Sequence, residues 1–536
     1  MSPLVSFDLV SEELRQQHSL QFFEPGRIQH ACDLVSRCRG LRHGQLSSAK
    51  KTRNFIYVVP DGFGPASQTL TRDYLTMGKG AEGTGKPNST RIGVDNMRYS
   101  SSAKMIGSVR TRSFDNLITD SAAAATAFSS GHKTYNRAIG VDPYVRPVAS
   151  VLEAAHLNGF KTGLVATARV TDATPASYCA HVPDRKLEDE IASQQIGYSH
   201  PLGPVVDVIM GGGRRHYLPR RLGGKRTGYD LITWAKALGY SYAANRHELA
   251  EYTNDLGKGI FPVPFLGLFA ESHMAYDIDR DPDKEPSLLE MTEAAVRSLA
   301  AATAKTEKGY FIMIEASQID DAAHANDIAA HVNDAVMYNR VMDFLRKYVA
   351  KHPNTQLLSA ADHECGGLTL TSGYDPSALA GAKRSTAFLQ RAFHNSTEPD
   401  RATYLRKSIL PQYGLRNTSD AAVDKYMDVY RREGESGLGR AMARDLAAQV
   451  GVKWSTTGHS AVDVNLYGLA VGKAYARMKT QVGGHVDNTE LPRYIAKTLG
   501  LDLDNATGVL RDSWVRYEGG PNCLGEGDAA ACKRPL

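Results

Sequence analysis

The stretch Phe55-Ile-Tyr-Val-Val-Pro-Asp61-Gly-Phe-Gly64 decides the fold class of this chain. Its apolar run predicts a buried strand, and the strand ends in the carboxylate of Asp61 and a glycine turn. Working outward, strand patterns also occur near residues 161–167, 310–315 and 356–361, and they alternate with helical patterns near 121–130, 149–158, 287–304 and 327–350. This alternation predicts an α/β fold with a mostly parallel central sheet and helices on both faces.

A second informative stretch, residues 116–128, holds a candidate nucleophile. An apolar run ends in Thr119-Asp120-Ser121, and small helix-forming residues follow at once. Ser121 is therefore expected in the first turn of a helix, where free backbone N–H groups and the helix dipole favour an anion. A hydroxyl there would meet a phosphate whose charge is already partly compensated. Taken alone, the segment also fits a helix cap made by Asp120 or Ser121.

Further polar groups recur where the predicted strands end, which is where open α/β sheets place their sites. They are Asp61, Glu315, Asp320, His324, Asp362 and His363, joined by His459. Nitrogen and carboxylate donors without cysteine suit zinc, and sets made only of oxygen suit magnesium. The sequence thus predicts a metal-dependent site.

The motifs around these residues carry a resemblance to a known family. They occur in that family's order, as Asp61-Gly-Phe-Gly-Pro-Ala-Ser67, Thr119-Asp-Ser-Ala122, Thr171-Asp-Ala-Thr-Pro-Ala176, Gly211-Gly-Gly-Arg214, Glu315-Ala-Ser-Gln-Ile-Asp320, Ala361-Asp-His-Glu-Cys-Gly-Gly367 and Thr457-Gly-His459. From about residue 54 to about residue 500 the chain resembles the alkaline phosphatase family, nearest its eukaryotic, fungal branch. The resemblance implies an alkaline-phosphatase-like fold, hydrolysis of small phosphomonoesters through a phosphoserine, and a homodimer.

The resemblance also implies roles for individual residues, with two zinc ions and one magnesium ion. It places one zinc at Asp320, His324 and His459, the second at Asp61, Asp362 and His363 with Ser121, and magnesium at Asp61, Thr174 and Glu315 with Asp172 holding a bound water. Arg185 stands thirteen residues after Asp172, as the family's phosphate-binding arginine does, and Asp120 is expected to orient it. A surface ion pair of Arg185 with Asp184 or Glu188 is the alternative.

Two positions depart from the family. Asp321 follows the zinc ligand Asp320, where the family typically has Lys or His, so we expect weaker phosphate binding here. Ala270 stands where a calcium-binding relative has an acidic ligand, with Glu271 one residue late, so we expect no structural calcium, although Glu285 remains available.

The organisation of the chain yields three segments. Residues 1–50 form an N-terminal extension of unclear status, residues 51–500 a catalytic domain with a cap-like helical insertion at about 375–455, and residues 501–536 a C-terminal tail in which Cys523 and Cys532 can pair. No run is long and apolar enough for a membrane helix, and no signal-peptide core is visible, although relatives are secreted, vacuolar or otherwise extracytoplasmic. The compartment stays open.

The 536 residues, with a net charge of +5, show no basic run dense enough for a nucleic-acid-binding surface. Two alternatives of function remain. One is a phosphodiesterase or sulfatase-like hydrolase of the same fold, which relative rates on phosphate monoesters and diesters would reveal. The other is a catalytically silent metal- or phosphate-binding protein, which would show no turnover when loaded with metal.

Overall fold

The structure, a computed structural model, describes residues 51–78, 94–95, 103–253 and 259–518. The N-terminal extension and the cysteine pair Cys523 and Cys532 lie outside these residues. Residues 49–536 form one compact unit.

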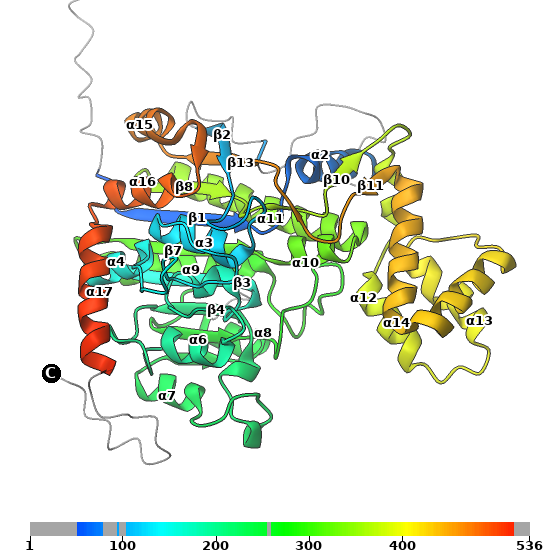
Figure 1. Cartoon of the computed structure of the whole chain (residues 1–536), viewed down its shortest axis with the longest axis horizontal. Coiled ribbons are helices and arrows are strands. Elements are labelled where there is room, and N and C mark those ends of the chain that lie inside the picture. Colours follow the sequence, from blue (N-terminus) through cyan, green and yellow to red (C-terminus); the bar gives the residue numbers. More distant parts are fainter. Residues whose placement is uncertain (1–50, 79–93, 96–102, 254–258, 519–536) are drawn as a thin grey trace, which may run out of the picture. The chain divides into compact units, whose positions relative to one another are not determined.

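A ten-stranded sheet forms the centre of this unit, in the order β14-β2-β13-β8-β1-β7-β3-β4-β6-β5 (Figure 1). All neighbouring strands are parallel except β13, which runs antiparallel to both β2 and β8. The mostly parallel sheet confirms the predicted fold class. The strands are β1 (Asn54–Pro60), β2 (Ala103–Arg110), β3 (Lys161–Arg169), β4 (Val208–Gly212), β5 (Ser241–Ala243), β6 (Phe265–Leu268), β7 (Tyr310–Ala316), β8 (Thr355–Ala360), β13 (Val464–Leu469) and β14 (Gly484–Asp487).

Strand β1 shows why the first stretch of sequence was decisive. All seven of its residues are buried, and it pairs in parallel on both sides, with Phe55 opposite Phe311 of β7 and Gln356 of β8. Parallel strands covered on both faces read as almost continuous apolar runs rather than as alternating ones. The unbroken run in the sequence is therefore the mark of a central strand.

Helices cover both faces of the sheet. On one face α9 and α11 pack against β3, β7 and β8, and on the other α4 packs against β3 and β7 while α16 packs against β1. The helices of this main body are α2 (Pro65–Asp73), α3 (Ser121–Ser130), α4 (Val151–Leu157), α5 (Ala173–Ala176), α6 (Glu188–Gln195), α7 (Leu231–Ala237), α8 (Arg246–Thr253), α9 (Leu288–Ala302), α10 (Gln318–His324), α11 (Ile328–Lys351), α15 (Lys473–Val482), α16 (Glu490–Leu499) and α17 (Leu503–Glu518).

Two of these helices begin in the same way. Ser150 and Glu153 form a capping box at α4, and Ser287 and Glu290 form one at α9. In each box the serine side chain accepts from a backbone N–H while the glutamate accepts from the N–H of the serine. The sequence therefore encodes where both helices start.

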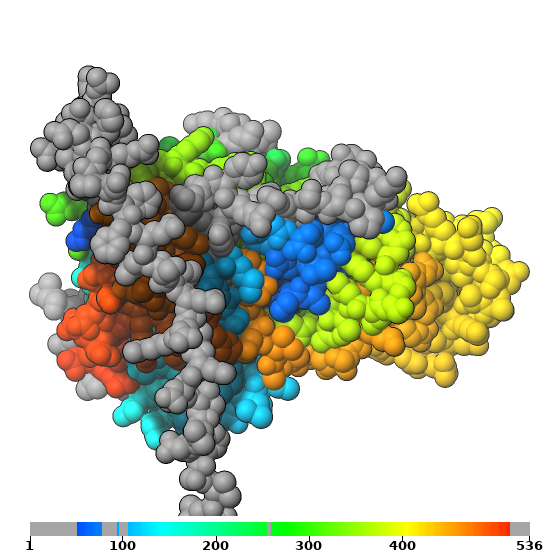
Figure 2. Space-filling model, turned by 90° about the horizontal axis from the view of Figure 1, so that it is seen from above, coloured from blue at the N-terminus to red at the C-terminus, as the bar shows by residue number. Residues whose placement is uncertain are grey.

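The segment expected as an insertion is largely helical. It contains α12 (Thr386–Asn395), α13 (Arg401–Tyr404) and α14 (Asp420–Val450), the last broken at Gly434, and ends at β11 (Val452–Trp454), which pairs with β10 (Leu368–Leu370). These helices share an apolar core that also takes in residues of α2 and α11. Figure 1 shows α12 and α13 together with α14, beyond the edge of the sheet toward which β1 runs, and Figure 2 shows the same yellow segment from above.

The C-terminal tail also contains structure, because α17 packs on α4. Arg511 donates to Pro147 O over 2.8 Å, and the hydroxyl of Thr507 accepts from Ala149 N over 3.0 Å. Within the described ranges, no helix is both long and apolar enough to cross a membrane.

Candidate active site

Four adjacent strands bring the candidate residues to one edge of the sheet. In the order β8-β1-β7-β3, each strand carries polar residues at or just beyond its carboxyl end. Because parallel neighbours end at the same edge, residues far apart in the sequence must meet there. The residues delivered are Asp362 and His363 after β8, Asp61 after β1, Glu315 near the end of β7, and Asp172 and Thr174 after β3.

The candidate nucleophile lies at the start of α3, as the sequence predicted. Ser121 is the first residue of the helix, and the cap is Asp120, whose carboxylate accepts from Ala123 N over 3.0 Å. The hydroxyl of Ser121 is therefore left free of the capping role. Its Oγ lies 3.1 Å from Nε2 of His363.

A first group of metal-ligand candidates consists of Asp320, His324 and His459. Asp320 and His324 lie one turn apart on α10, and His459 lies on β12 (His459–Ser460), which pairs with β9 (Glu364–Cys365). Nε2 of His324 lies 3.0 Å from Asp320 Oδ2 and 3.1 Å from Nε2 of His459. These donor atoms lie within 4.8 Å of one another, a spacing that suits one ion.

Backbone carbonyls fix the orientation of both imidazoles in this group. Nδ1 of His324 donates to Thr457 O over 2.6 Å, and Nδ1 of His459 donates to Thr119 O over 2.8 Å. Each ring therefore turns its Nε2 toward Asp320, as metal-ligating histidines do, and an ion bound there would take the place of any proton on Nε2. The side chain of Asp320 raises the pKa of His324 to about 9, whereas burial lowers the pKa of His459 to about 4.

A second group, Asp61, Asp362 and His363, is buried at the ends of β1 and β8. Nε2 of His363 lies 3.0 Å from Asp362 Oδ2 and 3.7 Å from Asp61 Oδ1. The turn after β1 reaches this group because Gly62 adopts φ +70°, and a Cβ there would lie 2.7 Å from Asp320 Oδ1. Burial and the charge of Asp362 raise the pKa of Asp61 well above its ordinary value. These carboxylates need a compensating positive charge.

Two further oxygen-bearing side chains, Thr174 and Glu315, are buried, and Glu315 interacts with both Asp61 and Thr174. Burial raises the pKa of Glu315 to about 8. An all-oxygen set of carboxylates and a hydroxyl is the kind of site that a hard divalent cation occupies.

Unsatisfied buried polar atoms at this sheet edge show whether the residues fit metal ions. Several of their buried polar atoms have no hydrogen-bond partner among the described residues: Asp61 Oδ1, Thr174 Oγ1, Glu315 Oε2, Asp320 Oδ1, Asp362 Oδ2 and His363 Nδ1. An unpaired buried polar group costs about 1–3 kcal/mol, and more if it is charged. Cations bound at this sheet edge would satisfy these unpaired atoms, so the residues fit metal ions.

Arg185 lies beside this group rather than on the surface. Its guanidinium donates to Asp172 Oδ1 over 2.8 Å and lies 3.3 Å from Asp120 Oδ2, and its side chain is 26% exposed. Although burial opposes the charge, Asp172 and Asp120 raise the pKa of Arg185. The two carboxylates considered as alternative partners are engaged elsewhere, Asp184 with Arg137 and Glu188 with Arg169.

Comparisons with known proteins agree with this geometry. The sequence profile described as alkaline phosphatase matches residues 52–501. This chain belongs to the alkaline phosphatase family. It is therefore a phosphoric monoester hydrolase.

The chain is similar to two yeast alkaline phosphatases, which confirms the expected fungal branch. It is 35% identical to the repressible alkaline phosphatase of Saccharomyces cerevisiae over 496 residues, 87% of this chain and 85% of that protein. It is 36% identical to the alkaline phosphatase of Schizosaccharomyces pombe over 485 residues, 88% of this chain and 86% of that protein. The crystal structure of Thermus thermophilus alkaline phosphatase matches with a TM-score of 0.70 and 26% identity, covering 88% of this chain and 99% of that one.

Three residues near this alkaline phosphatase site were not anticipated from the sequence. Arg169 donates to Asp172 over 2.6 Å, and it also pairs with His273, which lies 3.7 Å from Asp321. Cys365 is buried, with Sγ close to the donor atoms of Asp320, His324 and His459. Arg169 ends β3 three residues before Asp172, so its position was a usable signal, whereas His273 comes from a distant segment.

Asp321 lies at this site with a half-exposed side chain. Burial and the neighbouring acids Asp320 and Asp172 raise its pKa, while His273 opposes them. Its negative charge therefore has the imidazole of His273 beside it, which the sequence did not reveal.

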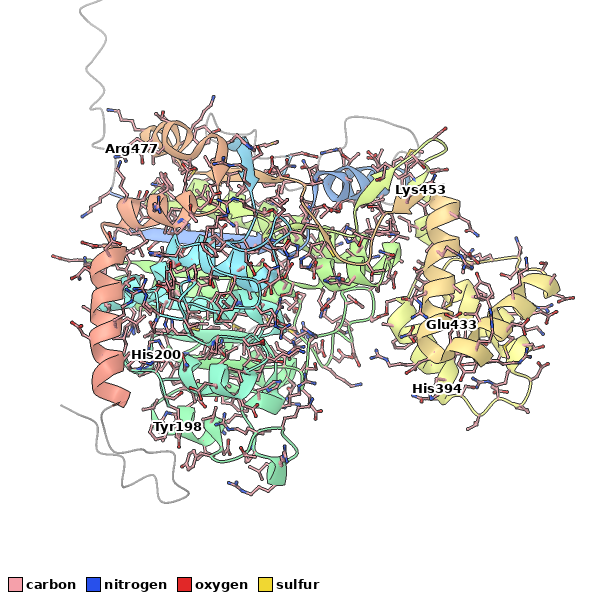
Figure 3. All side chains as sticks on the ribbon, in the orientation of Figure 1. Tyr198, His200, His394, Glu433, Lys453 and Arg477 are labelled. Atoms are coloured by element: carbon pink, nitrogen blue, oxygen red, sulfur yellow. The ribbon has the colours of Figure 1, made fainter. Side chains whose placement is uncertain are left out.

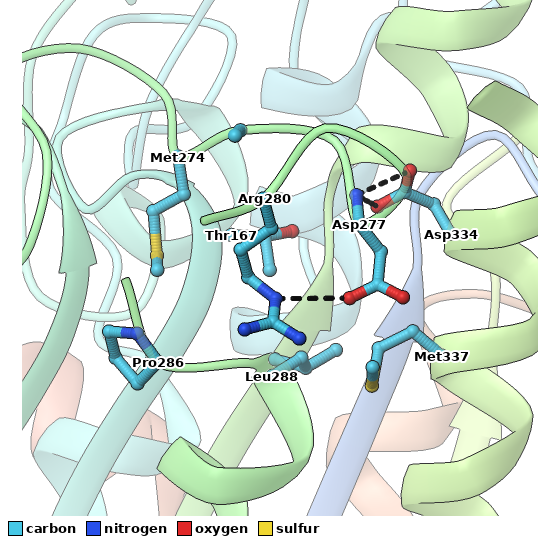
Figure 4. Close-up of a pocket in the computed structure, with 9 residues that line it drawn as sticks. Thr167, Met274, Asp277, Arg280, Pro286, Leu288, Asp334 and Met337 are labelled. Carbon is cyan, nitrogen blue, oxygen red and sulfur yellow. Dashed lines mark hydrogen bonds and ion pairs between the residues drawn. The ribbon is translucent and has the colours of Figure 1, made fainter. Parts of the chain in front are cut away.

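The segment compared with calcium sites of relatives lines a small pocket (Figure 4). There Arg280 donates to Asp277 Oδ1 over 3.2 Å, and Asp334 accepts from Asp277 N. Glu285, the remaining candidate ligand, accepts from Ala275 N over 2.9 Å. An arginine thus occupies the neighbourhood of these acids.

Proposed function

We propose that this alkaline phosphatase hydrolyses small phosphomonoesters through a covalent phosphoserine on Ser121. The observation that carries the proposal is the placement of the Ser121 hydroxyl at a helix N-terminus, 3.1 Å from His363 and beside the unpaired ligand atoms. A free N-terminus and a positive dipole favour an entering phosphate. No other side chain is needed to cap the helix, because Asp120 does so.

We further propose which residues hold metal. Zinc suits Asp320, His324 and His459, and a second zinc suits Asp61, Asp362 and His363, since both sets combine imidazole with carboxylate. Magnesium suits Asp61, Thr174 and Glu315, with Asp172 close by. When bound, these cations would supply the positive charge that stabilises the transferring phosphoryl group.

The chain's own residues then have distinct tasks. The guanidinium of Arg185, held by Asp172 and Asp120, presents a planar fork that fits two phosphate oxygens. Ser121 Oγ forms a bond to phosphorus as the bond to the substrate oxygen breaks. The hydroxyl proton of Ser121 passes to solvent, and the leaving oxygen takes up a proton from solvent and departs as an alcohol. Water then attacks the phosphoserine, releasing phosphate and restoring the hydroxyl.

Assembly is a further part of the proposal. Family membership supports a homodimer, with the segment carrying α12–α14 beside the interface. The mass of the particle in solution tests this directly, and a monomer at working concentrations would contradict it.

The function is tested by turnover and by trapping the intermediate. Metal-loaded protein should hydrolyse a generic phosphomonoester much faster than a diester. A brief acid quench followed by peptide mass spectrometry should place a phosphoryl group on Ser121. A phosphoryl group on another residue would contradict the assignment, and a higher rate on the diester would indicate the phosphodiesterase alternative.

A further inference from the structure

A second group of buried carboxylate and imidazole side chains lies away from the proposed metal site. Glu153 of α4, His181 and His200 have side chains that are at most 1% exposed. Oε1 of Glu153 lies 2.8 Å from His181 Nε2 and 2.9 Å from His200 Nε2. Figure 3 labels His200, which lies on the side of the sheet where α17 packs. We refer to these three residues as the Glu153 cluster.

The hydrogen bonds of the Glu153 cluster assign its protons. Nδ1 of His181 lies 2.6 Å from the carbonyl of Gly140 and must donate, and its Nε2 faces a carboxylate and must donate as well. His181 is therefore an imidazolium. Nδ1 of His200 accepts from Leu202 N over 3.1 Å, so its single proton lies on Nε2 and is donated to Glu153.

This proton arrangement argues against a metal in the Glu153 cluster. A metal ligand needs a free lone pair, yet Nδ1 of His200 already accepts from a backbone N–H, so its Nε2 must keep the proton that Glu153 accepts. The other carboxylate oxygen, Oε2, accepts from Ser150 N over 2.7 Å. The pKa directions agree: burial opposes both charges, but Glu153 raises the pKa of His181 and the two imidazoles hold the pKa of Glu153 well below its usual range.

His181 begins the short segment that ends at Arg185. Its backbone N donates to Gln194 Oε1 over 2.8 Å, and Val182 forms an antiparallel bridge with Ile139. Arg185 N donates to Arg137 O over 2.8 Å. The 181–185 segment is therefore fixed along its length, and the Glu153 cluster anchors the end at which it begins.

The partner segment is tied in turn to the helix that carries the nucleophile. Gly140 N donates to Thr126 Oγ1 over 3.0 Å, and Thr126 lies on α3. A Cβ at Gly140 would lie 2.1 Å from Ala180 O and 2.7 Å from His181 Nδ1, so the close approach requires glycine. Displacement of His181 would thus shift the 181–185 segment relative to Ser121.

We propose that the Glu153 cluster is a positioning device for Arg185, holding its guanidinium where it meets substrate phosphate. The inference rests on the phosphate-binding role proposed for Arg185. Glu153, His181 and His200 are positioning residues, because they act on phosphate only through the backbone of residues 181–185.

The experiment is a double-mutant cycle between Glu153→Gln and Arg185→Ala, read as the inhibition constant for inorganic phosphate. Glu153→Gln keeps the shape of the side chain, but the amide NH2 group cannot accept the hydrogen bonds that the carboxylate accepts from Ser150 N, His181 and His200. Coupled positions typically interact strongly enough to change an equilibrium by about threefold to tenfold or more. We expect phosphate inhibition to weaken by that factor in the parent and KM to rise more than kcat falls. In the Arg185→Ala background the same change should have no further effect.

A matched control is Glu290→Gln, which alters the other glutamate of a capping box that also pairs with a cation, Arg246. It should leave phosphate inhibition unchanged. The proposal would be overturned if Glu153→Gln changed the phosphate inhibition constant equally in the parent and in the Arg185→Ala variant. It would also be overturned if the change were no larger than that caused by Glu290→Gln.

Two further readouts complete the test. If Glu153→Gln fails to fold, His200→Gln replaces it and should weaken phosphate inhibition in the parent only. Loss of one metal equivalent in either variant would mean that the Glu153 cluster binds metal, against the proposal. If Arg185→Ala alone leaves phosphate inhibition unchanged, the phosphate-binding role proposed for Arg185 is wrong. If Arg185→Ala weakens phosphate inhibition but the effects of the two substitutions add independently, only the positioning role of the Glu153 cluster is wrong.

Discussion

The proposed metal site and the Glu153 cluster use the same kinds of side chain but differ in their hydrogen bonds. In the Glu153 cluster each polar atom has a partner, and one imidazolium neutralises one carboxylate. At the sheet edge, six buried polar atoms have none among the described residues. Carboxylates and imidazoles in close proximity are therefore not enough to identify a metal site.

The difference also shows in the direction of the pKa shifts. At the sheet edge, buried acids crowd together, so the pKa values of Asp61 and Glu315 are raised. In the Glu153 cluster, the pKa of the single buried acid is lowered by its histidines. An excess of acids calls for added cations, whereas a balanced group is complete without them.

The largest expected effect comes from removing the nucleophile. Ser121→Ala should lower kcat by roughly 10³-fold or more, because no hydroxyl remains to form the phosphoserine. Metal content should stay unchanged, since the imidazoles and carboxylates remain. Steady-state kinetics together with metal analysis check this, and a variant that retains most of its turnover would exclude Ser121 as the nucleophile.

The next effect concerns the residue that connects the two regions. Arg185→Ala removes charge-assisted hydrogen bonds worth about 1.5–3 kcal/mol, so phosphate should inhibit roughly tenfold more weakly or beyond. The thermal midpoint should change little. Phosphate inhibition at fixed pH measures the effect, and an unchanged constant would remove Arg185 from the site.

The ionic character of the Glu153 cluster predicts a pH dependence of stability. The pKa of Glu153 is depressed in the folded chain. Its carboxylate therefore stabilises the fold at pH values above its ordinary pKa of 4.5, and this stabilisation is lost as the pH falls. The pKa of His181 is raised in the folded chain. Its imidazolium therefore stabilises the fold below the ordinary pKa of 6.5, and this stabilisation is lost as the pH rises through the raised pKa. The other titratable groups that face them are His200, His156 and Cys179.

Glu153→Gln should therefore destabilise the chain most between about pH 4.5 and 6.5, by about 3 kcal/mol, and less at alkaline pH. Denaturant unfolding at pH 6 and pH 10, with Glu290→Gln alongside, measures the difference. If Glu153→Gln lowered the free energy of unfolding equally at pH 6 and pH 10, the Glu153 cluster would not contain an ion pair.

Sequence reasoning reached the sheet edge because parallel strands must end together there. Asp61, Glu315 and His363 each follow or end an apolar run, so their meeting needed only the fold class. The Glu153 cluster was not visible, since Glu153 reads as a capping residue and His200 follows no strand. Side-chain orientation across distant segments, as for His273 with Asp321, depends on packing that a linear pattern does not encode.

The smallest expected effect is at Asp321. Asp321→His removes a negative charge near the phosphate position, so phosphate inhibition should tighten. Arg169 carries a positive charge close enough to interact with Asp321, so part of the negative charge of Asp321 is already offset, and we expect a change of only about twofold to fivefold. Comparison with Asp321→Asn separates loss of the acid from gain of the imidazole, and no tightening in either variant would contradict the argument.

Metal content measured on purified parent, Glu153→Gln and Asp320→Asn proteins tests most directly whether unpaired donors, not carboxylate–imidazole proximity alone, mark the metal site. We predict two zinc ions and one magnesium ion per parent chain, the same content in Glu153→Gln, and loss of zinc in Asp320→Asn. Removing the metals with a chelator should lower the stability of the parent by about 4 kcal/mol for each ion that was present at a thousand times its dissociation constant. If Glu153→Gln lost a zinc ion and Asp320→Asn kept its zinc, the claim that unpaired donors mark the metal site would be contradicted.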